Sequence, residues 1–393
     1  MNIIMNKFLY GKIGFALILA SSLGLTSCLS DGDSTIVLEN GNSTGIPDDS
    51  KATPNPTITN TTTQIPNINY TVSTEGNDAI VNIEMTGVQE AGTFDWLKLY
   101  GTSDNEQNIW VSVDGKPKGI SVINNSDEEN EEKMKADLVF IVDNSGSMSE
   151  EADAIARDII SWTQKLEASN IDIKFGCVGY DGSITGAVNM GDASAMSTFL
   201  NRSTGTNRTM GFYGSDKEAL QKSASSYFVD SGMDENGSAA IQYGDHNMNF
   251  RTGANRIYVN FTDEPNFPCG KNKFSTEFFK DQLNWSSVQG TVHTVFSSDT
   301  AYVYRQEKLY TLERPWRMSW YTGGTVLVAP SNFKGITLES LPVTGAMQNS
   351  YTIRFTNVGE FMDGKSHLVK ITIMSKDGKT CAERSFYVTF GTK

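Results

Sequence analysis

A group of oxygen-bearing side chains follows a buried stretch in the middle of the chain. Asp143, Ser145 and Ser147 have the spacing D-x-S-x-S directly after the apolar run 136–142, and the stretch 256–262 ends in Asp263. Ligands of open parallel sheets bind at the carboxyl ends of strands, and hard divalent cations such as Mg²⁺ prefer oxygen ligands. The sequence has neither a catalytic dyad nor a phosphate-cradling glycine loop. These residues are therefore candidate oxygen ligands at one edge of a sheet, and we expect no enzyme.

Strands that alternate with helices are expected to position this site. We predict buried strands at 136–142, 173–180, 256–262, 291–296 and 325–328. We predict helices at 150–166, 193–200, 215–228 and 237–248. Such alternation is typical of an α/β domain, built as a doubly wound, mainly parallel sheet with helices on both faces. We place this domain at residues 136–332.

The motifs of this region resemble the von Willebrand factor A family and its metal-ion-dependent adhesion site. The resemblance rests on DLVFIVDNSGSM at 137–148, on FTDE at 261–264 and on TGG at 322–324, and it covers about half of the chain. It implies a Rossmann-type fold and a bound Mg²⁺, or Mn²⁺ or Ca²⁺. It implies that Ser145 and Ser147 ligate the ion directly, while Asp143 and Asp263 hold coordinated waters. Neutral ligands leave the ion able to bind a carboxylate of a partner protein.

The third metal-binding loop departs from the family pattern, which has a threonine there. The sequence has no Gly-Gly-Thr before the helix at 237–248, and Asp234 is our first candidate for the missing ligand. Glu235, Thr206 and Thr209 are the alternatives. A direct Asp234 ligand would hold the ion more tightly and would weaken its attraction for a partner carboxylate.

Other interpretations of these residues are structural. Asp143 and the two serines could cap a helix without any ion, although Asp263 independently ends another predicted strand. A phosphatase would need a second aspartate at position 145, where the chain has Ser145. We expect the three histidines to be surface or packing residues, and we expect packing roles for Trp316 and Trp320.

Two β-rich segments flank the α/β region. The first, 68–126, has predicted strands at 80–85, 94–100 and 109–113, and an acidic stretch at 127–135 follows as a solvated linker. The second segment, 333–393, has predicted strands at 336–338, 351–355, 367–373 and 385–390. Each segment is small for an independent sandwich. We therefore expect one β-sandwich that contains the α/β domain as an insertion, with two separate modules as the alternative.

The N-terminal residues indicate export. The apolar run 13–25 follows Lys7 and Lys12 and is too short to span a bilayer. It ends in LTSC at 25–28, which resembles the bacterial lipoprotein cleavage box, so we expect a signal peptide at 1–27 and a lipidated Cys28. Residues 28–67 are polar and proline-containing, which predicts a disordered tether.

Composition limits the partners. The 393 residues include 32 Lys and Arg against 46 Asp and Glu, a formal net charge of −14 that argues against nucleic acid. The sequence does not decide whether Cys269 and Cys381 form a disulfide. We expect a lipid-anchored protein of the bacterial cell envelope, on the surface or the periplasmic face of the outer membrane. Its partner would be a protein or a glycan; alternatively, it is a structural module of an envelope assembly whose ion serves folding.

Overall fold

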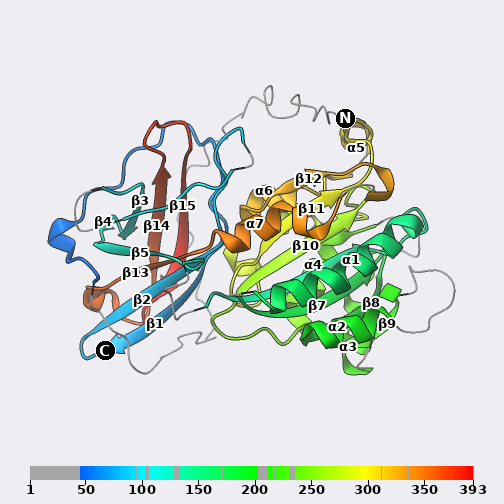
Figure 1. The fold of residues 1–393 in the computed structure, drawn as a ribbon, viewed down its shortest axis with the longest axis horizontal. Coiled ribbons are helices and arrows are strands. Elements are labelled where there is room, and N and C mark those ends of the chain that lie inside the picture. Colours follow the sequence, from blue (N-terminus) through cyan, green and yellow to red (C-terminus); the bar gives the residue numbers. More distant parts are fainter. Residues whose placement is uncertain are drawn as a thin grey trace.

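A computed structural model describes residues 45–392, with gaps at 94, 102–105, 128–132, 170, 202–210, 216–217, 230–234, 311 and 334–335. Two parts lie side by side along the long axis of the molecule (Figure 1). One part consists of two four-stranded sheets, and the other is a seven-stranded sheet with helices. The predicted signal peptide, Cys28 and the first part of the tether lie outside the described residues.

The first part is a β-sandwich-like unit whose two sheets each contain strands from both ends of the chain. The sheet orders are β1-β2-β13-β5 and β15-β14-β3-β4. Buried residues of both sheets form one hydrophobic core. The two predicted β segments therefore build one unit. Its strands are β1 (Asn69–Glu75), β2 (Asp78–Met85), β3 (Ile109–Val113), β4 (Lys116–Pro117), β5 (Ile120–Asn124), β13 (Tyr351–Phe355), β14 (Ser366–Met374) and β15 (Cys381–Thr389).

The second part has the sheet order β12-β11-β10-β6-β7-β8-β9. Strand β6 pairs in parallel with β7 and β10, whereas β7 and β8 are antiparallel. The strands are β6 (Lys135–Asp143), β7 (Asp172–Tyr180), β8 (Ile184–Gly191), β9 (Gly214–Ser215), β10 (Asn255–Thr262), β11 (Thr291–Phe296) and β12 (Val326–Val328). The helices of the chain are α1 (Ser149–Glu167), α2 (Ala193–Leu200), α3 (Glu218–Ser223), α4 (Gly237–Asn247), α5 (Thr300–Leu309), α6 (Arg317–Thr322) and α7 (Pro342–Gln348).

The predicted fold class, a doubly wound and mainly parallel sheet, is wrong for this chain. Both four-stranded sheets are wholly antiparallel, and the seven-stranded sheet contains the antiparallel pair β7–β8. The chain is a mixed α/β protein with mostly antiparallel pairing and a β-sandwich-like arrangement. The prediction failed because it took the fold class from the α/β region, whereas the two four-stranded sheets contribute much of the strand pairing. It also missed β8, whose sequence is rich in glycine and polar residues.

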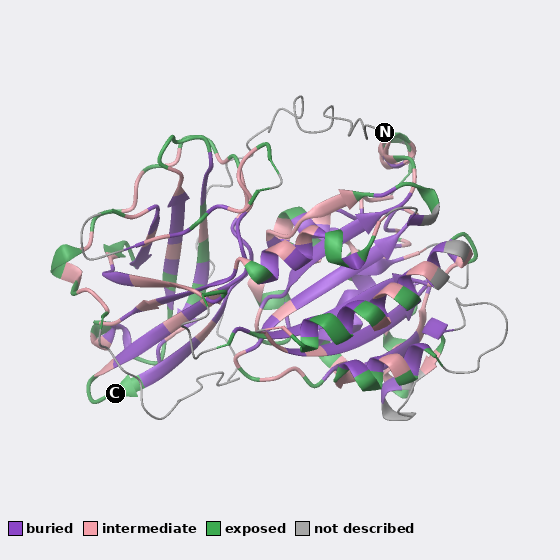
Figure 2. Ribbon diagram, viewed as in Figure 1, coloured by how far each residue is buried: buried purple, intermediate pink, exposed green. Residues whose placement is uncertain are grey.

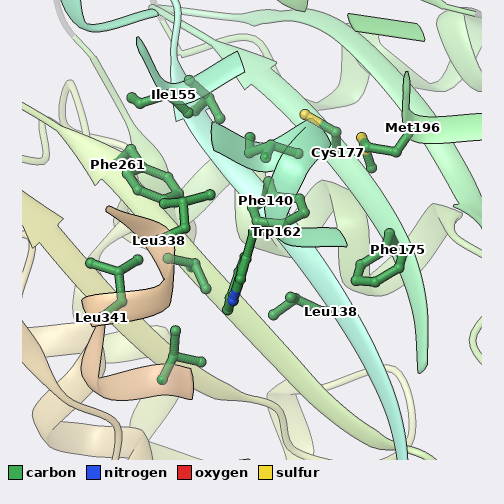
Figure 3. Packing of buried hydrophobic residues seen from close by; sticks show 14 of the residues in the cluster. Leu138, Phe140, Ile155, Trp162, Phe175, Cys177, Met196, Phe261, Leu338 and Leu341 are labelled. Atoms are coloured by element: carbon green, nitrogen blue, oxygen red, sulfur yellow. The ribbon is translucent and has the colours of Figure 1, made fainter. Parts of the chain in front are cut away.

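Aromatic packing anchors the helices to one face of the seven-stranded sheet. Phe140 on β6 meets Trp162 on α1 edge-on, with ring centroids 5.8 Å apart. Phe140 also stacks on Phe175, with ring centroids 6.5 Å apart (Figure 3). Leu338 and Leu341 join the same core. The stretch before α7 thus packs with the α/β part, although we assigned it to the C-terminal β segment. The strands are mostly buried, whereas the helices expose their outer faces (Figure 2).

Several local predictions differ from the structure. Residues 336–338 form no strand, and a 3₁₀ turn covers Leu338–Ser340. The described residues of 94–100 form only an isolated bridge, between Gln89 and Trp96. Cys269 and Cys381 form no disulfide with each other, and the Cys381 thiol donates to the Asn60 carbonyl at 2.9 Å. No helix in the described parts of the chain is long and apolar enough to cross a membrane.

The described part of the predicted tether is docked on the sandwich. The buried Lys118 ammonium binds Asp49 at 2.5 Å, and the Thr62 amide donates to the Cys381 carbonyl at 2.8 Å. Ile65 is fully buried in the sandwich core. From residue 45 onward, this segment is therefore part of the fold and differs from the expected free tether, because long-range hydrogen bonds and burial offset its ordering entropy.

His367 on β14 should make stability depend on pH. Burial alone lowers the His367 pKa, but ring hydrogen bonds to Asp114 (2.8 Å) and Asp363 (3.0 Å) outweigh burial and raise the pKa above 6.5. The folded state then binds more protons than the unfolded chain, so this stabilisation is complete below the unfolded pKa and is lost as pH rises through the folded pKa. We expect His367→Gln to destabilise the protein more at about pH 5.5 than at about pH 9. Urea unfolding at both pH values measures this difference.

His246→Gln is the matched control, because the His246 ring contacts only a backbone carbonyl, that of Gln242, among the hydrogen bonds of the described residues. An equal loss of stability at both pH values for His367→Gln would contradict the assignment of a charged histidine.

Candidate functional site

The parallel pairing of β6 with β10 positions the candidate site. Phe261 lies opposite Val142, so Asp143 and Asp263 follow paired residues at the same edge of the sheet. Asp143 is the last residue of β6, and the turn with Ser145 and Ser147 leads from it into α1. This brings four of the five predicted metal residues to one edge. Asp234, the fifth, and the alternatives Thr206 and Thr209 lie outside the described residues.

A chain of hydrogen bonds connects these side chains. The Ser145 amide donates to Asp143 Oδ1 at 3.0 Å, and the Ser145 and Ser147 hydroxyl oxygens are 2.9 Å apart. The Ser147 hydroxyl donates to Asp263 Oδ1 at 3.1 Å. The Asp143 carboxylate is buried, whereas Ser147 is exposed. The site therefore has a buried carboxylate at its bottom and hydroxyl groups at its rim, which solvent and a ligand can reach.

Thr262 is a further residue of the candidate site that the sequence argument did not select. Its hydroxyl donates to Asp143 Oδ2 at 2.8 Å, and it accepts the Glu264 amide at 3.1 Å. Together with the Ser145 amide, it fixes both oxygens of Asp143. Thr262 directly precedes Asp263 at the end of the strand, and this position was the sequence feature that could have identified it.

Burial raises the pKa of four carboxylates in this region, namely Asp143, Glu235, Asp263 and Glu264. Burial raises the pKa of Asp143 to about 7, and Asp263 adds to the increase. Burial, with repulsion from Asp143, raises the pKa of Glu235 to about 8. Burial, with repulsion from Asp263, raises the pKa of Glu264 to about 6. Within the described residues no ion pair involves any of the four, so this edge of the sheet lacks compensating positive charge.

Glu235 is the candidate for the third-loop ligand that lies within the described residues. Its backbone carbonyl accepts the Phe267 amide at 2.9 Å, just beyond the strand end that carries Asp263. Repulsion from Asp143, Glu264 and Asp263 contributes to its raised pKa.

The donor set fits a hard divalent cation. Serine hydroxyls and carboxylates supply oxygen ligands, and the uncompensated negative charge favours a cation at this place. In the described parts of the chain, no group of three or more His, Cys, Asp or Glu side chains is arranged to hold a metal ion. The expected direct ligands Ser145 and Ser147 are hydroxyls and do not belong to those residue types. Ser145 and Ser147 would hold the ion, and the ion would supply an electrophilic centre for an acidic group.

Comparisons with known proteins do not extend this assignment. No protein-family model matches the chain, and no curated protein matches it. Similar solved structures include proximal thread matrix protein 1 from the mussel byssus, at 10% identity and a TM-score of 0.30 over 55% of this chain and 48% of that one. Human Sec24c matches at 8% identity and a TM-score of 0.28, over 71% of this chain and 47% of that one.

The pilus adhesin SpaC of Lactobacillus rhamnosus GG matches at 11% identity and a TM-score of 0.32, over 81% of this chain and 55% of that one. The chain therefore spans about half of the length of these structures. Similarities at this level carry no argument about fold or function, so the site must be argued from its own residues.

Proposed function

We propose that this chain is an exported binding or adhesion protein that recognises its partner through a divalent cation at Asp143, Ser145, Ser147 and Asp263. The observation that carries the proposal is the linked pair of solvent-accessible hydroxyls, which lies beside carboxylates without a compensating cation. Neutral hydroxyl ligands leave a bound ion with unsatisfied charge, which an acidic group of a partner can satisfy. The resemblance of D-x-S-x-S to metal-ion-dependent adhesion sites supports the same function.

The proposal includes a location and a partner class. The resemblance of residues 25–28 to a lipoprotein cleavage box supports attachment through Cys28 to the bacterial outer membrane. The partner would be a protein that presents a carboxylate, or a glycan. The cation would be Mg²⁺, or Mn²⁺ or Ca²⁺. The chain itself would perform no catalysis.

One observation favours a second function, a structural module whose ion serves folding. The Asp143 carboxylate is buried, and its pKa is raised to about 7, so a cation would relieve an unfavourable buried charge. In that case the ion would stabilise the fold without capturing a partner.

A two-part experiment separates these functions. The full chain is immobilised and exposed to envelope extracts with Mg²⁺ or with EDTA, beside a Ser147→Ala variant, and melting is measured under the same conditions. For a recognition site, we expect retention of a partner that requires both Mg²⁺ and Ser147, with little change in melting temperature. Metal-independent retention together with a lower melting temperature in EDTA would instead assign the ion to folding.

A further inference from the structure

A second hollow lies between the two parts of the molecule, away from the Asp143 edge. Its volume is 430 Å³, within the range of small-molecule sites. The chain segment after β2, helix α6 and strand β11 contribute to its walls. Six of the lining residues carry the argument: Thr86, Glu90, Trp96, His293, Trp320 and Thr325.

Two tryptophans give the hollow aromatic walls. Trp320 on α6 is 36% exposed, so we correct our expectation of a core-packing role for it, whereas Trp316 is buried as expected. The Trp96 ring is held between two glycines: an added Cβ at Gly87 would lie 2.8 Å from it, and one at Gly345 would lie 2.3 Å from it. Trp96 is thus a fixed surface, and Trp320 is an accessible one.

Two buried polar atoms at this hollow have no partner. His293 Nε2 and Thr86 Oγ1 are without a hydrogen bond within the described protein, and both residues are 3% exposed. The Thr325 amide donates to His293 Nδ1 at 3.1 Å, which places the ring proton on Nε2. Burial lowers the His293 pKa to about 3, so the ring stays neutral and Nε2 is a donor. Buried polar groups are nearly always paired, so these two lining residues are candidates to pair with a ligand, although both atoms are almost closed off from solvent and the lining must shift to expose them.

The charge of the hollow selects the class of ligand. Glu90 is the single charged side chain among the residues that line it, and the lining has no lysine or arginine to bind an anion. The other polar groups are hydroxyls, amides, an imidazole and backbone groups. The lining therefore disfavours an anion and suits a ligand that carries hydroxyl groups for His293 and Thr86 and an apolar C–H face for the indole rings.

We propose that this hollow binds a neutral sugar ring of a glycan, which packs against Trp320 and Trp96 and, with a small shift of the lining, hydrogen-bonds to His293 Nε2 and Thr86 Oγ1. The site is separate from the cation site and does not require a metal. Recognition of the sugar here would thus stand even if the proposed cation-dependent function failed.

The test titrates the full chain with neutral oligosaccharides, namely cellotetraose, maltotetraose and chitotetraose, in EDTA. Saturation-transfer NMR and tryptophan fluorescence detect binding. We expect at least one of them to bind with a Kd below about 1 mM. Trp320→Ala should weaken binding about tenfold or more. Thr86→Val should weaken binding about tenfold, the equivalent of one hydrogen bond, while melting temperature stays equal or rises because an unpaired hydroxyl is removed.

Tyr387→Ala is the matched control, because Tyr387 is an exposed aromatic residue that does not line this hollow. It should bind like the unmodified chain. The proposal is overturned if none of the oligosaccharides binds at about 10 mM, or if Trp320→Ala and Thr86→Val both keep full affinity. Binding that appears only when Mg²⁺ replaces EDTA would also overturn it, since the sugar would then depend on the cation.

Discussion

Replacing Arg251 by methionine should lower the free energy of unfolding by about 3–5 kcal/mol. The Arg251 side chain lies where β6 and β7 begin, and it binds Asp137 at 2.7 Å and Asp172 at 2.5 Å. Asp137 is fully buried. In the methionine variant, the Asp137 carboxylate would keep its hydrogen bond from the backbone amide of residue 251 but would lose the positive charge of the guanidinium. Removal of one partner of a buried pair is costly because the remaining charge stays desolvated.

Arg251 also donates to the backbone carbonyls of Ala136 and Asp172, at 2.8 and 2.9 Å, so lysine should restore the charge but only part of the stability. Arg305→Met is the matched control, because its pair with Asp299 is 3.6 Å long and both side chains are more than 60% exposed. The control should change stability by less than about 0.5 kcal/mol. Urea unfolding of all variants gives the comparison. A loss below about 1 kcal/mol for Arg251→Met would contradict a buried role of Asp137.

Asp263→Asn should weaken Mg²⁺ binding by about 10- to 100-fold, the usual cost of losing an outer-shell metal partner. Asparagine can still accept the hydrogen bond from Ser147, so the turn should stay in place. The negative charge that raises the pKa of Asp143 and Glu264 would be removed. The metal-free variant should therefore be at least as stable as the unmodified chain at about pH 8, where those carboxylates are mostly ionised.

Calorimetric titration with Mg²⁺ measures the affinity, and thermal melting in EDTA checks the fold. Asp299→Asn is the control, since Asp299 caps α5 and its side chain is exposed; it should leave Mg²⁺ affinity unchanged. Equal Mg²⁺ affinity in Asp263→Asn, or no Mg²⁺ binding by the unmodified chain, would remove the site from consideration.

Much of the candidate site could be anticipated because it depends on neighbouring residues. Asp143, Ser145 and Ser147 are separated by one residue each, and the apolar run before them is long enough to identify a buried strand. Asp263 joins them because β10 pairs with β6 in a register that sets Phe261 opposite Val142. The role of Thr262 required the structure, since a threonine at a strand end is common and its hydrogen bond to Asp143 spans 119 positions.

The rest of the fold depends on pairings that local patterns do not encode. Tyr351 pairs with both Met85 and Asn124, and although alternation predicts the strand 351–355, it does not reveal these two partners. The leading segment looks like a tether because its binding energy comes from distant groups such as Lys118 and the Cys381 carbonyl. The hollow lined by Trp96 and Trp320 could not be anticipated either, because these residues are far apart in sequence and share a hollow only in the folded molecule.

Because each sheet of the sandwich contains strands from both ends of the chain, the order of synthesis determines when the sandwich can be completed. Strands β1 to β5 are synthesised first, but the edge of β2 that receives β13 stays open until more than two hundred further residues have been made. Pairing over such separations is slow, because the loop must close before its contacts contribute. Open strand edges are also sites of aggregation. The β2 edge of the nascent sandwich is therefore exposed to such association until β13 has been made.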